Sequence, residues 1–139
     1  MMYEYEEEFP DKNTYICPPL NSTEASNIIF YKCSDTDKLP SDYMLPLIER
    51  GNSPNTDDKR CQMCGHSVFL NIEDITNLLN KKSKLTKGVK GKWKYIFSFD
   101  GAINSKFLHT PSKINKQHYT YWHYGRDDIK YVYISEIND

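Results

Sequence analysis

Three extended segments with alternating side chains constrain the fold of this chain more than any other feature. KWKYIFSF (92–99) places four aromatic side chains on one face of an extended segment: Trp93, Tyr95, Phe97 and Phe99. Asp100 and Gly101 then supply a turn. HYTYWHY (118–124) and KYVYISEI (130–137) are two more extended runs. Half-buried strands of this kind require a sheet and a layer that covers it.

Two further strands and one helix are predicted in the first half of the chain. Residues 28–33 and 66–70 are short runs of β-branched and aromatic residues, which is typical of strands. Asn71 can cap a following helix that carries four apolar residues on one face: Ile72, Ile75, Leu78 and Leu79. We therefore predict an α+β domain with a small mixed or antiparallel sheet of about five strands and one principal helix.

Length and charge predict how this domain is bounded. A chain of 139 residues is long enough for one domain with its own core. The first residues carry a cluster of acidic side chains, which are Glu4, Glu6, Glu7, Glu8 and Asp11. We interpret residues 1–24 as a loose acidic arm and residues 25–139 as a single α+β domain.

The sequence favours a cytoplasmic protein. It has no apolar run near the roughly 18 residues that a membrane span needs. Its start, MMYEYEEEF, is acidic, whereas a secretory leader is basic and then apolar. In the reducing cytoplasm its four cysteines are expected to be thiols or metal ligands rather than disulfides: Cys17, Cys33, Cys61 and Cys64.

The segment RCQMCGH (60–66) raises the question of a zinc site. A Cys-x-x-Cys-Gly turn can supply two of four tetrahedral ligands, and Cys61 and Cys64 suit that role. No second pair with this spacing follows, because Cys17 and Cys33 lie far apart and His66 begins a strand. We therefore assign no metal ligand and favour a pair of thiols, with a zinc clip at Cys61 and Cys64 as the alternative.

The most basic segment of the chain, KKSKLTKGVKGKWK (81–94), is predicted to be a flexible loop. Its seven lysines and Trp93 could attract the phosphates and bases of a nucleic acid. The net charge of the chain is only −1, and the acidic N-terminal segment can neutralise the loop. We therefore favour a solvated loop over a nucleic-acid site.

One predicted strand carries a candidate binding face. His118, Thr120 and Trp122 alternate and so share one side of it. An imidazole can act as a general base, a hydroxyl can bind phosphate and an indole can stack on a base or a nicotinamide. The alternative is that these side chains only pack against neighbouring elements.

The order of several short motifs resembles a family of small, uncharacterised bacterial proteins. Its elements are Pro40, Ser41, Asp42 and Tyr43; Arg50 and Gly51; Gly65, Ser67, Val68 and Phe69; and His118, Thr120 and Trp122. The resemblance covers roughly residues 28–137 and implies a shared fold and surface rather than a named reaction. Lys32 stands where members of that family tend to carry arginine, and the paired cysteines are a departure from the family pattern.

More distantly, the pattern is similar to the ADP-ribosyltransferase fold. The resemblance implies that a split sheet holds nicotinamide dinucleotide, that Tyr31 or Lys32 contacts the dinucleotide, and that Ser67 supports its ribose. It also implies a late-strand glutamate that orients the ribose, and Glu136 is the one glutamate in that place. Against this, Glu136 lies three residues from the chain end and has the features of an exposed terminal glutamate.

Two hypotheses for function follow. In the first, the chain is a nucleotide-using enzyme with His118, Ser67 and Glu136 as catalytic residues and with Tyr31, Lys32, Thr120 and Trp122 as cofactor-binding residues. This hypothesis predicts that Lys32, Ser67 and His118 line one cleft. In the second, the chain is a bacterial or phage interaction module of accessory or immunity type, which binds a protein partner through its acidic arm and aromatic strands and has no small-molecule pocket.

Overall fold

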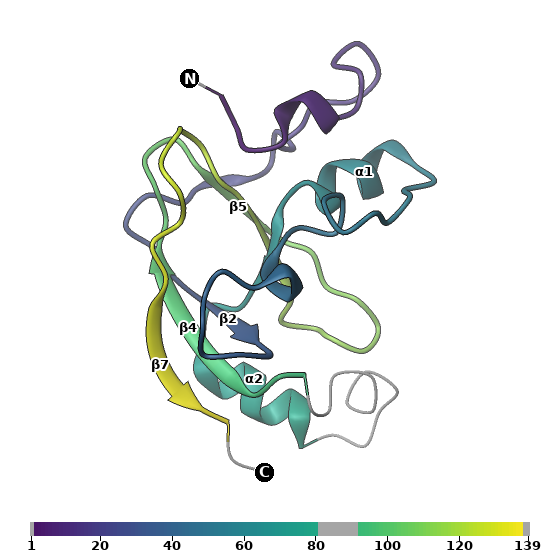
Figure 1. Ribbon diagram of the computed structural model, residues 1–139. Coiled ribbons are helices and arrows are strands. Elements are labelled where there is room, and N and C mark those ends of the chain that lie inside the picture. The colour runs from purple at the N-terminus through teal and green to yellow at the C-terminus, as the bar shows by residue number, and fades with distance from the viewer. Residues whose placement is uncertain (1, 81–91, 138–139) are drawn as a thin grey trace.

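Two antiparallel sheets and two α-helices form the fold of the part of the chain that the computed structural model describes, residues 2–80 and 92–137 (Figure 1). The predicted α+β class is therefore confirmed. The predicted five strands and one principal helix were approximate, because the described residues hold seven strands. The prediction did not include the short strands β1 (Thr23–Glu24) and β5 (Lys106–His109) or the helix α1 (Asp57–Met63).

The first sheet has the order β2-β4-β7. Its strands are β2 (Ile29–Ser34), β4 (Tyr95–Asp100) and β7 (Val132–Glu136). The aromatic segment KWKYIFSF supplies the central strand β4, whose residues 96, 97 and 99 are all buried. It is buried on both faces because the helix α2 (Ile72–Leu79) covers one side and the second sheet covers the other.

The second sheet has the order β1-β5-β6-β3, with β6 at Tyr119–Trp122 and β3 at His66–Val68. Short 3₁₀ helices, η1 (Glu6–Glu8) and η2 (Asp42–Met44), lie outside both sheets. Tyr31 and Phe69 exchange two backbone hydrogen bonds, N–H to O, of 2.8 and 2.9 Å. This bridge ties the end of β3 to β2 and so fixes one sheet beside the other.

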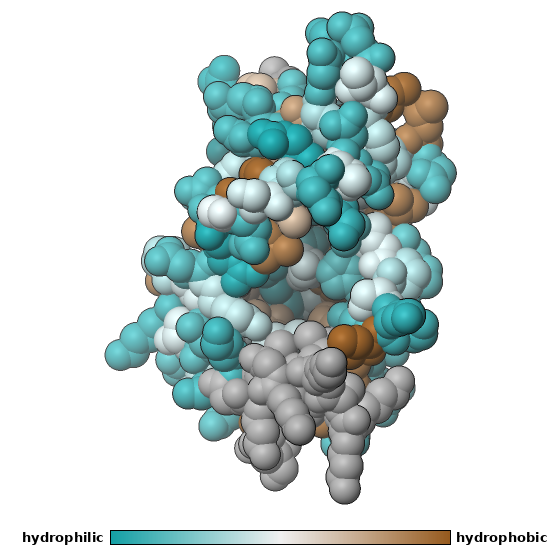
Figure 2. Space-filling model, turned by 90° about the vertical axis from the view of Figure 1, so that its right-hand side faces the viewer, coloured by the Kyte–Doolittle hydropathy of each residue, from teal (hydrophilic) through white to brown (hydrophobic). Residues whose placement is uncertain are grey.

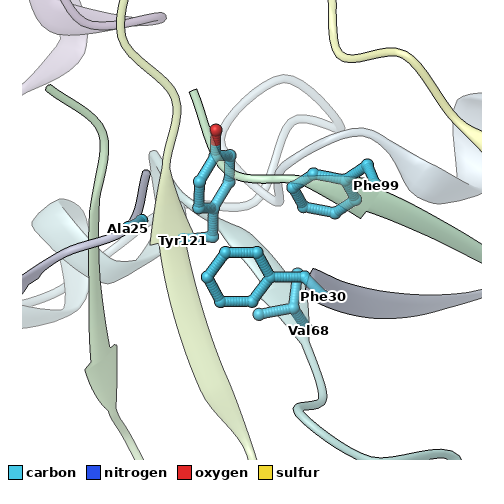
Figure 3. Close-up of a cluster of buried hydrophobic side chains, with 5 residues drawn as sticks. All are labelled: Ala25, Phe30, Val68, Phe99 and Tyr121. Carbon is cyan, nitrogen blue, oxygen red and sulfur yellow. The ribbon is translucent and has the colours of Figure 1, made fainter. Parts of the chain in front are cut away.

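Each face of the first sheet has its own apolar cluster. Between the sheets, the rings of Phe30, Phe99 and Tyr121 point toward one another beside two smaller side chains, Ala25 and Val68 (Figure 3). On the opposite face, Ile75 and Leu78 of α2 pack with Cys33, Phe69 and Ile96. The predicted apolar stripe of this helix therefore faces the sheet as expected.

The N-terminal segment is held to the rest of the protein at several points. Glu4 Oε1 lies 2.6 Å from His66 Nε2, and Glu8 Oε2 forms a 3.0 Å ion pair with Arg60 Nη2. Further along, β1 pairs with β5. The expectation of a loose arm is therefore wrong, because this acidic segment finds basic partners on the folded domain. The division of the chain into an arm of residues 1–24 and a domain of residues 25–139 stays a prediction.

A disulfide between Cys17 and Cys61 joins the N-terminal segment to α1. The expectation that these two cysteines are thiols is wrong, and so is the alternative of a zinc clip on Cys61 and Cys64, because the Cys61 sulfur is already bonded. Spacing along the chain gave no sign that residue 17 folds back onto this helix. Cys33 and Cys64 are free, buried thiols.

The structure bears only in part on where the protein resides. Within residues 2–80 and 92–137, no helix combines the length and the apolar character that crossing a membrane requires. Disulfides persist mainly in oxidising compartments, so the Cys17–Cys61 bond gives no support to the cytoplasmic assignment. That assignment stays a prediction.

The disulfide generates a first testable prediction. Replacing Cys17→Ser should lower the free energy of unfolding by about 2–4 kcal/mol, because the bond closes a long loop in the unfolded chain. Its cysteines are 44 residues apart. Urea unfolding of the wild type and the variant measures the difference.

Reductant supplies the control for this prediction. It should lower the stability of the wild type to that of the Cys17→Ser protein and leave the variant unchanged. Thiol counting in denatured, unreduced protein should find the two free cysteines, Cys33 and Cys64. Four reactive thiols, or equal stability of the two proteins, would contradict the disulfide.

Candidate functional site

A pocket of about 390 Å³ lies where β2, the edge of β3 and the segments that flank β5 and β6 meet. We call it the Lys32 pocket. The face shown in Figure 2 is hollowed near its middle, and its apolar atoms are scattered rather than gathered into one large patch. The polar, ionisable and aromatic side chains that line the pocket are Lys32, Cys33, Tyr43, Arg50, Gln62, Ser67, Phe69, Trp93, Thr110, Ser112, Asn115 and His118.

Lys32 contributes a buried ammonium to this pocket. It lies on β2, where alternation puts its side chain on the opposite face from Tyr31 and Cys33, and it is only 6 % exposed. Its Nζ donates a 3.1 Å hydrogen bond to the backbone carbonyl of Ser67 on β3. Burial, with the nearby charge of Arg50, lowers the pKa of Lys32 to about 7.

Arg50 adds a second cation, at the exposed side of the pocket. Its guanidinium lies over the ring of Tyr43, with 5.4 Å from Cζ to the ring centroid, and Lys92 Nζ lies 5.9 Å from the same centroid. No aspartate or glutamate occurs among the described residues that line the pocket. Within residues 2–80 and 92–137, no carboxylate forms an ion pair with Lys32 or Arg50. The described lining of the pocket therefore holds two basic side chains and no carboxylate, and the carboxylate that acts on Lys32, that of Glu4, lies outside this lining.

A chain of hydrogen bonds crosses one wall of the pocket. His118 Nε2 lies 2.9 Å from Ser67 Oγ, and His118 Nδ1 lies 3.0 Å from the carbonyl oxygen and 2.8 Å from the hydroxyl of Thr110. Three neighbouring strands position these groups, because β6 pairs with β3 on one side and with β5 on the other. Burial lowers the pKa of His118, so the imidazole is neutral at pH 7.

Aromatic side chains form the remaining wall. Trp93 Nε1 donates a 2.7 Å hydrogen bond to the hydroxyl of Tyr43, and the ring of Phe69 meets the indole edge-on at 5.8 Å between centroids. Both Trp93 and Tyr43 are half-buried and line the pocket. Fixed aromatic rings of this kind offer a flat ligand a stacking surface.

Three of the residues that the sequence analysis selected come together here. Lys32, Ser67 and His118 line the same pocket, and Ser67 contacts both of the others. This convergence is what the enzyme hypothesis expected of them. Their roles in binding or catalysis stay predictions.

The other selected residues lie elsewhere. Tyr31 packs on the opposite face of β2, in the cluster that α2 covers. Thr120 and Trp122 are each 1 % exposed; Thr120 Oγ1 contacts Thr110 Oγ1 at 2.8 Å, and Trp122 Nε1 donates to the Cys61 carbonyl. Glu136 is exposed on β7, where it is paired with Tyr95, and does not line the pocket.

Several pocket residues were missed as site residues by the sequence analysis. Arg50 and Tyr43 were noticed only as parts of the resemblance. Trp93 was noticed as a strand residue and as part of the disfavoured nucleic-acid site. No sequence pattern marks Thr110 as a pocket residue, because its position depends on backbone pairing with the segment that leads into β6. Five of the lysines expected in a flexible loop lie outside the described residues: Lys81, Lys82, Lys84, Lys87 and Lys90.

The buried ammonium generates a prediction about stability. The unfolded chain binds more protons than the folded protein between pH 7 and about 10.5, because folding lowers the pKa of Lys32 to about 7. The charged form therefore destabilises the fold at neutral pH. Replacing Lys32→Met should raise the free energy of unfolding at pH 7 by about 2 kcal/mol, and this gain should shrink as the pH rises to 10.

Denaturant unfolding at several pH values measures this effect. Lys106→Met is the matched control, because Lys106 is more exposed and pairs with Glu24 at 3.5 Å; its effect should stay within about 0.5 kcal/mol. If Lys32→Met destabilises the protein at pH 7, the ammonium serves the fold rather than a site.

Comparison with known proteins adds no relative from which a role could be transferred. No protein-family model, no curated protein and no solved structure matches the chain. The resemblances noted in the sequence remain hypotheses.

Proposed function

We propose that the Lys32 pocket binds a phosphorylated nucleotide, with nicotinamide dinucleotide as the first candidate. The observation that carries the proposal is a buried lysine with a second cation nearby and no carboxylate among the described residues of the pocket. A bound phosphate would supply the missing counter-charge. Titratable groups that are strongly perturbed in a pocket are typical of functional sites.

The free energy of burying the Lys32 ammonium supports anion binding. A buried charge without an ion-pair partner is costly, and none is found for Lys32 among the described residues; the pKa of about 7 expresses that cost. A chain that served stability alone would do better with an apolar residue at this position. An anion beside Nζ would stabilise the protonated form of Lys32. The free energy that the unliganded protein loses by burying this charge would then be regained when an anionic ligand binds.

Shape and lining favour a nucleotide over a small inorganic anion. A volume of about 390 Å³ falls in the usual range of about 300–1,000 Å³ for small-molecule sites. Lys32 and Arg50 can hold phosphate, while the indole of Trp93 can stack on a base or a nicotinamide. This combination of charge and flat apolar surface matches the two halves of a nucleotide.

Transfer of ADP-ribose is not part of this proposal. The resemblance to that fold relied on Glu136 to orient the ribose, but Glu136 lies on β7 and outside the pocket. What supports nucleotide binding is the meeting of Lys32, Ser67 and His118. We therefore propose binding of the nucleotide without assigning that reaction.

An interaction module remains the second candidate. Its supporting observation is β7, which exposes Val132, Tyr133 and Ile134 by 59 %, 50 % and 39 %. The presence of a pocket counts against it, because that hypothesis expected none. A zinc clip no longer belongs to it, since Cys61 is bonded to Cys17.

Calorimetric titration with nicotinamide dinucleotide tests nucleotide binding. We expect the wild type to bind, and the Lys32→Met and Arg50→Ala proteins to bind at least about 10-fold more weakly, because each loses a charge-assisted contact worth about 1.5–3 kcal/mol. Nicotinamide riboside, which lacks the phosphates, should bind more weakly to the wild type and should lose little affinity in either variant.

Lys106→Ala is the control for charge alone, since it removes one lysine outside the pocket. Its affinity should match that of the wild type. If the wild type binds neither the dinucleotide nor adenosine monophosphate, or if both pocket variants bind as tightly as the control, the proposal fails and the interaction module becomes the better candidate.

A further inference from the structure

Ser67, His118 and Thr110 form a linear set of contacts at the mouth of the Lys32 pocket. Ser67 is exposed, and its Oγ lies 2.9 Å from His118 Nε2. On the other side of the imidazole, Nδ1 lies 3.0 Å from the carbonyl oxygen of Thr110. A hydroxyl, an imidazole and an acceptor that orients the imidazole are the three parts of an activated nucleophile.

The proton on the imidazole can be assigned from these partners. A carbonyl oxygen only accepts hydrogen bonds, so the contact with Thr110 places the proton on Nδ1 of His118. The Thr110 hydroxyl accepts from the same proton and can donate to Thr120 Oγ1 at 2.8 Å. Nε2 of the neutral ring is then unprotonated and accepts the hydrogen bond of the Ser67 hydroxyl.

The surroundings of His118 keep its imidazole neutral at pH 7, so that it can accept a proton. Burial lowers the pKa of His118, and Lys32 adds a smaller effect in the same direction, whereas the bond to Thr110 opposes them. No carboxylate contacts the imidazole among its described neighbours. Ser67 itself remains open to the pocket, so a ligand can reach its oxygen.

We propose that Ser67 is a nucleophile that attacks a phosphoryl group of the ligand in the Lys32 pocket, with His118 as its general base and the Thr110 carbonyl as the group that positions His118. The choice of a phosphoryl substrate rests on the proposed function. Lys32 Nζ is bonded to the backbone of the same serine, which places a cation beside the group that would be attacked.

The chemistry balances without a further cofactor. The Ser67 oxygen forms a bond to phosphorus while the bond from phosphorus to the leaving oxygen breaks and that oxygen keeps the electron pair. The serine proton passes to His118 Nε2 and then to the leaving oxygen. In a second step a water oxygen attacks phosphorus, its proton passes through His118 to Ser67, and the serine–phosphorus bond breaks. The net reaction is hydrolysis.

A structural alternative must be separated from this proposal. The same hydrogen bonds could simply tie the edge of β3 to the segment before β6. A tie of that kind needs no reactive oxygen at Ser67 and no neutral imidazole. Chemical reactivity, rather than stability, therefore distinguishes the two.

An alkyl fluorophosphonate tests the nucleophile directly. Attack by Ser67 breaks the phosphorus–fluorine bond, releases fluoride and leaves a covalent label that peptide mass spectrometry can locate. We expect one label at Ser67 in the wild type and none at that position in Ser67→Ala. His118→Gln should slow labelling at least about 100-fold, the usual contribution of a general base.

A matched control and a pH profile accompany this test. Ser22→Ala removes a serine whose hydroxyl donates to the Pro19 carbonyl outside the pocket, and this variant should label like the wild type. Because burial lowers the pKa of His118, the wild-type labelling rate should rise with pH to a plateau, and the midpoint of that rise should lie below about pH 6.5. A tie without catalytic function would show no such profile.

The outcomes separate this proposal from nucleotide binding. No label at Ser67 in folded wild type, or an unchanged rate in His118→Gln, would overturn the nucleophile even if nicotinamide dinucleotide binds. A label that depends on His118 supports the nucleophile, and protection by the dinucleotide places the attack in the proposed nucleotide site. A label without protection supports the nucleophile and contradicts the nucleotide as its substrate.

Discussion

The candidate site depends on one destabilising arrangement, the burial of Lys32 where the two sheets meet. Its ammonium crosses from β2 to the backbone of β3, next to the Tyr31–Phe69 bridge that ties these strands together. The pocket forms around it, with Ser67 and His118 on one side and Trp93 and Tyr43 on another. Since this charge opposes folding at neutral pH, we propose that it serves to bind an anionic ligand.

The rest of the fold holds this arrangement in place. The Cys17–Cys61 disulfide anchors the N-terminal segment on α1, and Trp122 donates to the backbone of Cys61 beneath it. These contacts fix β6 and with it the segment that carries His118. Gly65 allows the approach, because a Cβ there would collide with the Thr120 side chain. The acidic N-terminal segment thus belongs to the scaffold of the site.

What the sequence could predict followed from local pattern. Alternating aromatics predicted β4, and four apolar residues at helical spacing predicted α2. Local pattern also selected His118, whereas Lys32 and Ser67 were selected through the resemblance to the ADP-ribosyltransferase fold. Contacts between residues far apart in the sequence were not predictable in this way, because they leave no periodic pattern: Cys17 is bonded to Cys61, and Glu4 contacts His66. The contact of Thr110 with His118 is closer in sequence, but it depends on how the segment between β5 and β6 folds. Trp122 shared a predicted face with His118, but α1 covers it.

The pKa of the Lys32 ammonium, followed by NMR in protein with isotope-labelled lysine side chains, tests the central claim most directly. The Lys32→Met protein identifies the resonance. We predict a pKa near 7 in the free protein that rises when nicotinamide dinucleotide is added, because a bound anion stabilises the protonated form of the buried amine. A value near the ordinary 10.4 that the dinucleotide leaves unchanged would show a solvated lysine and contradict the claim.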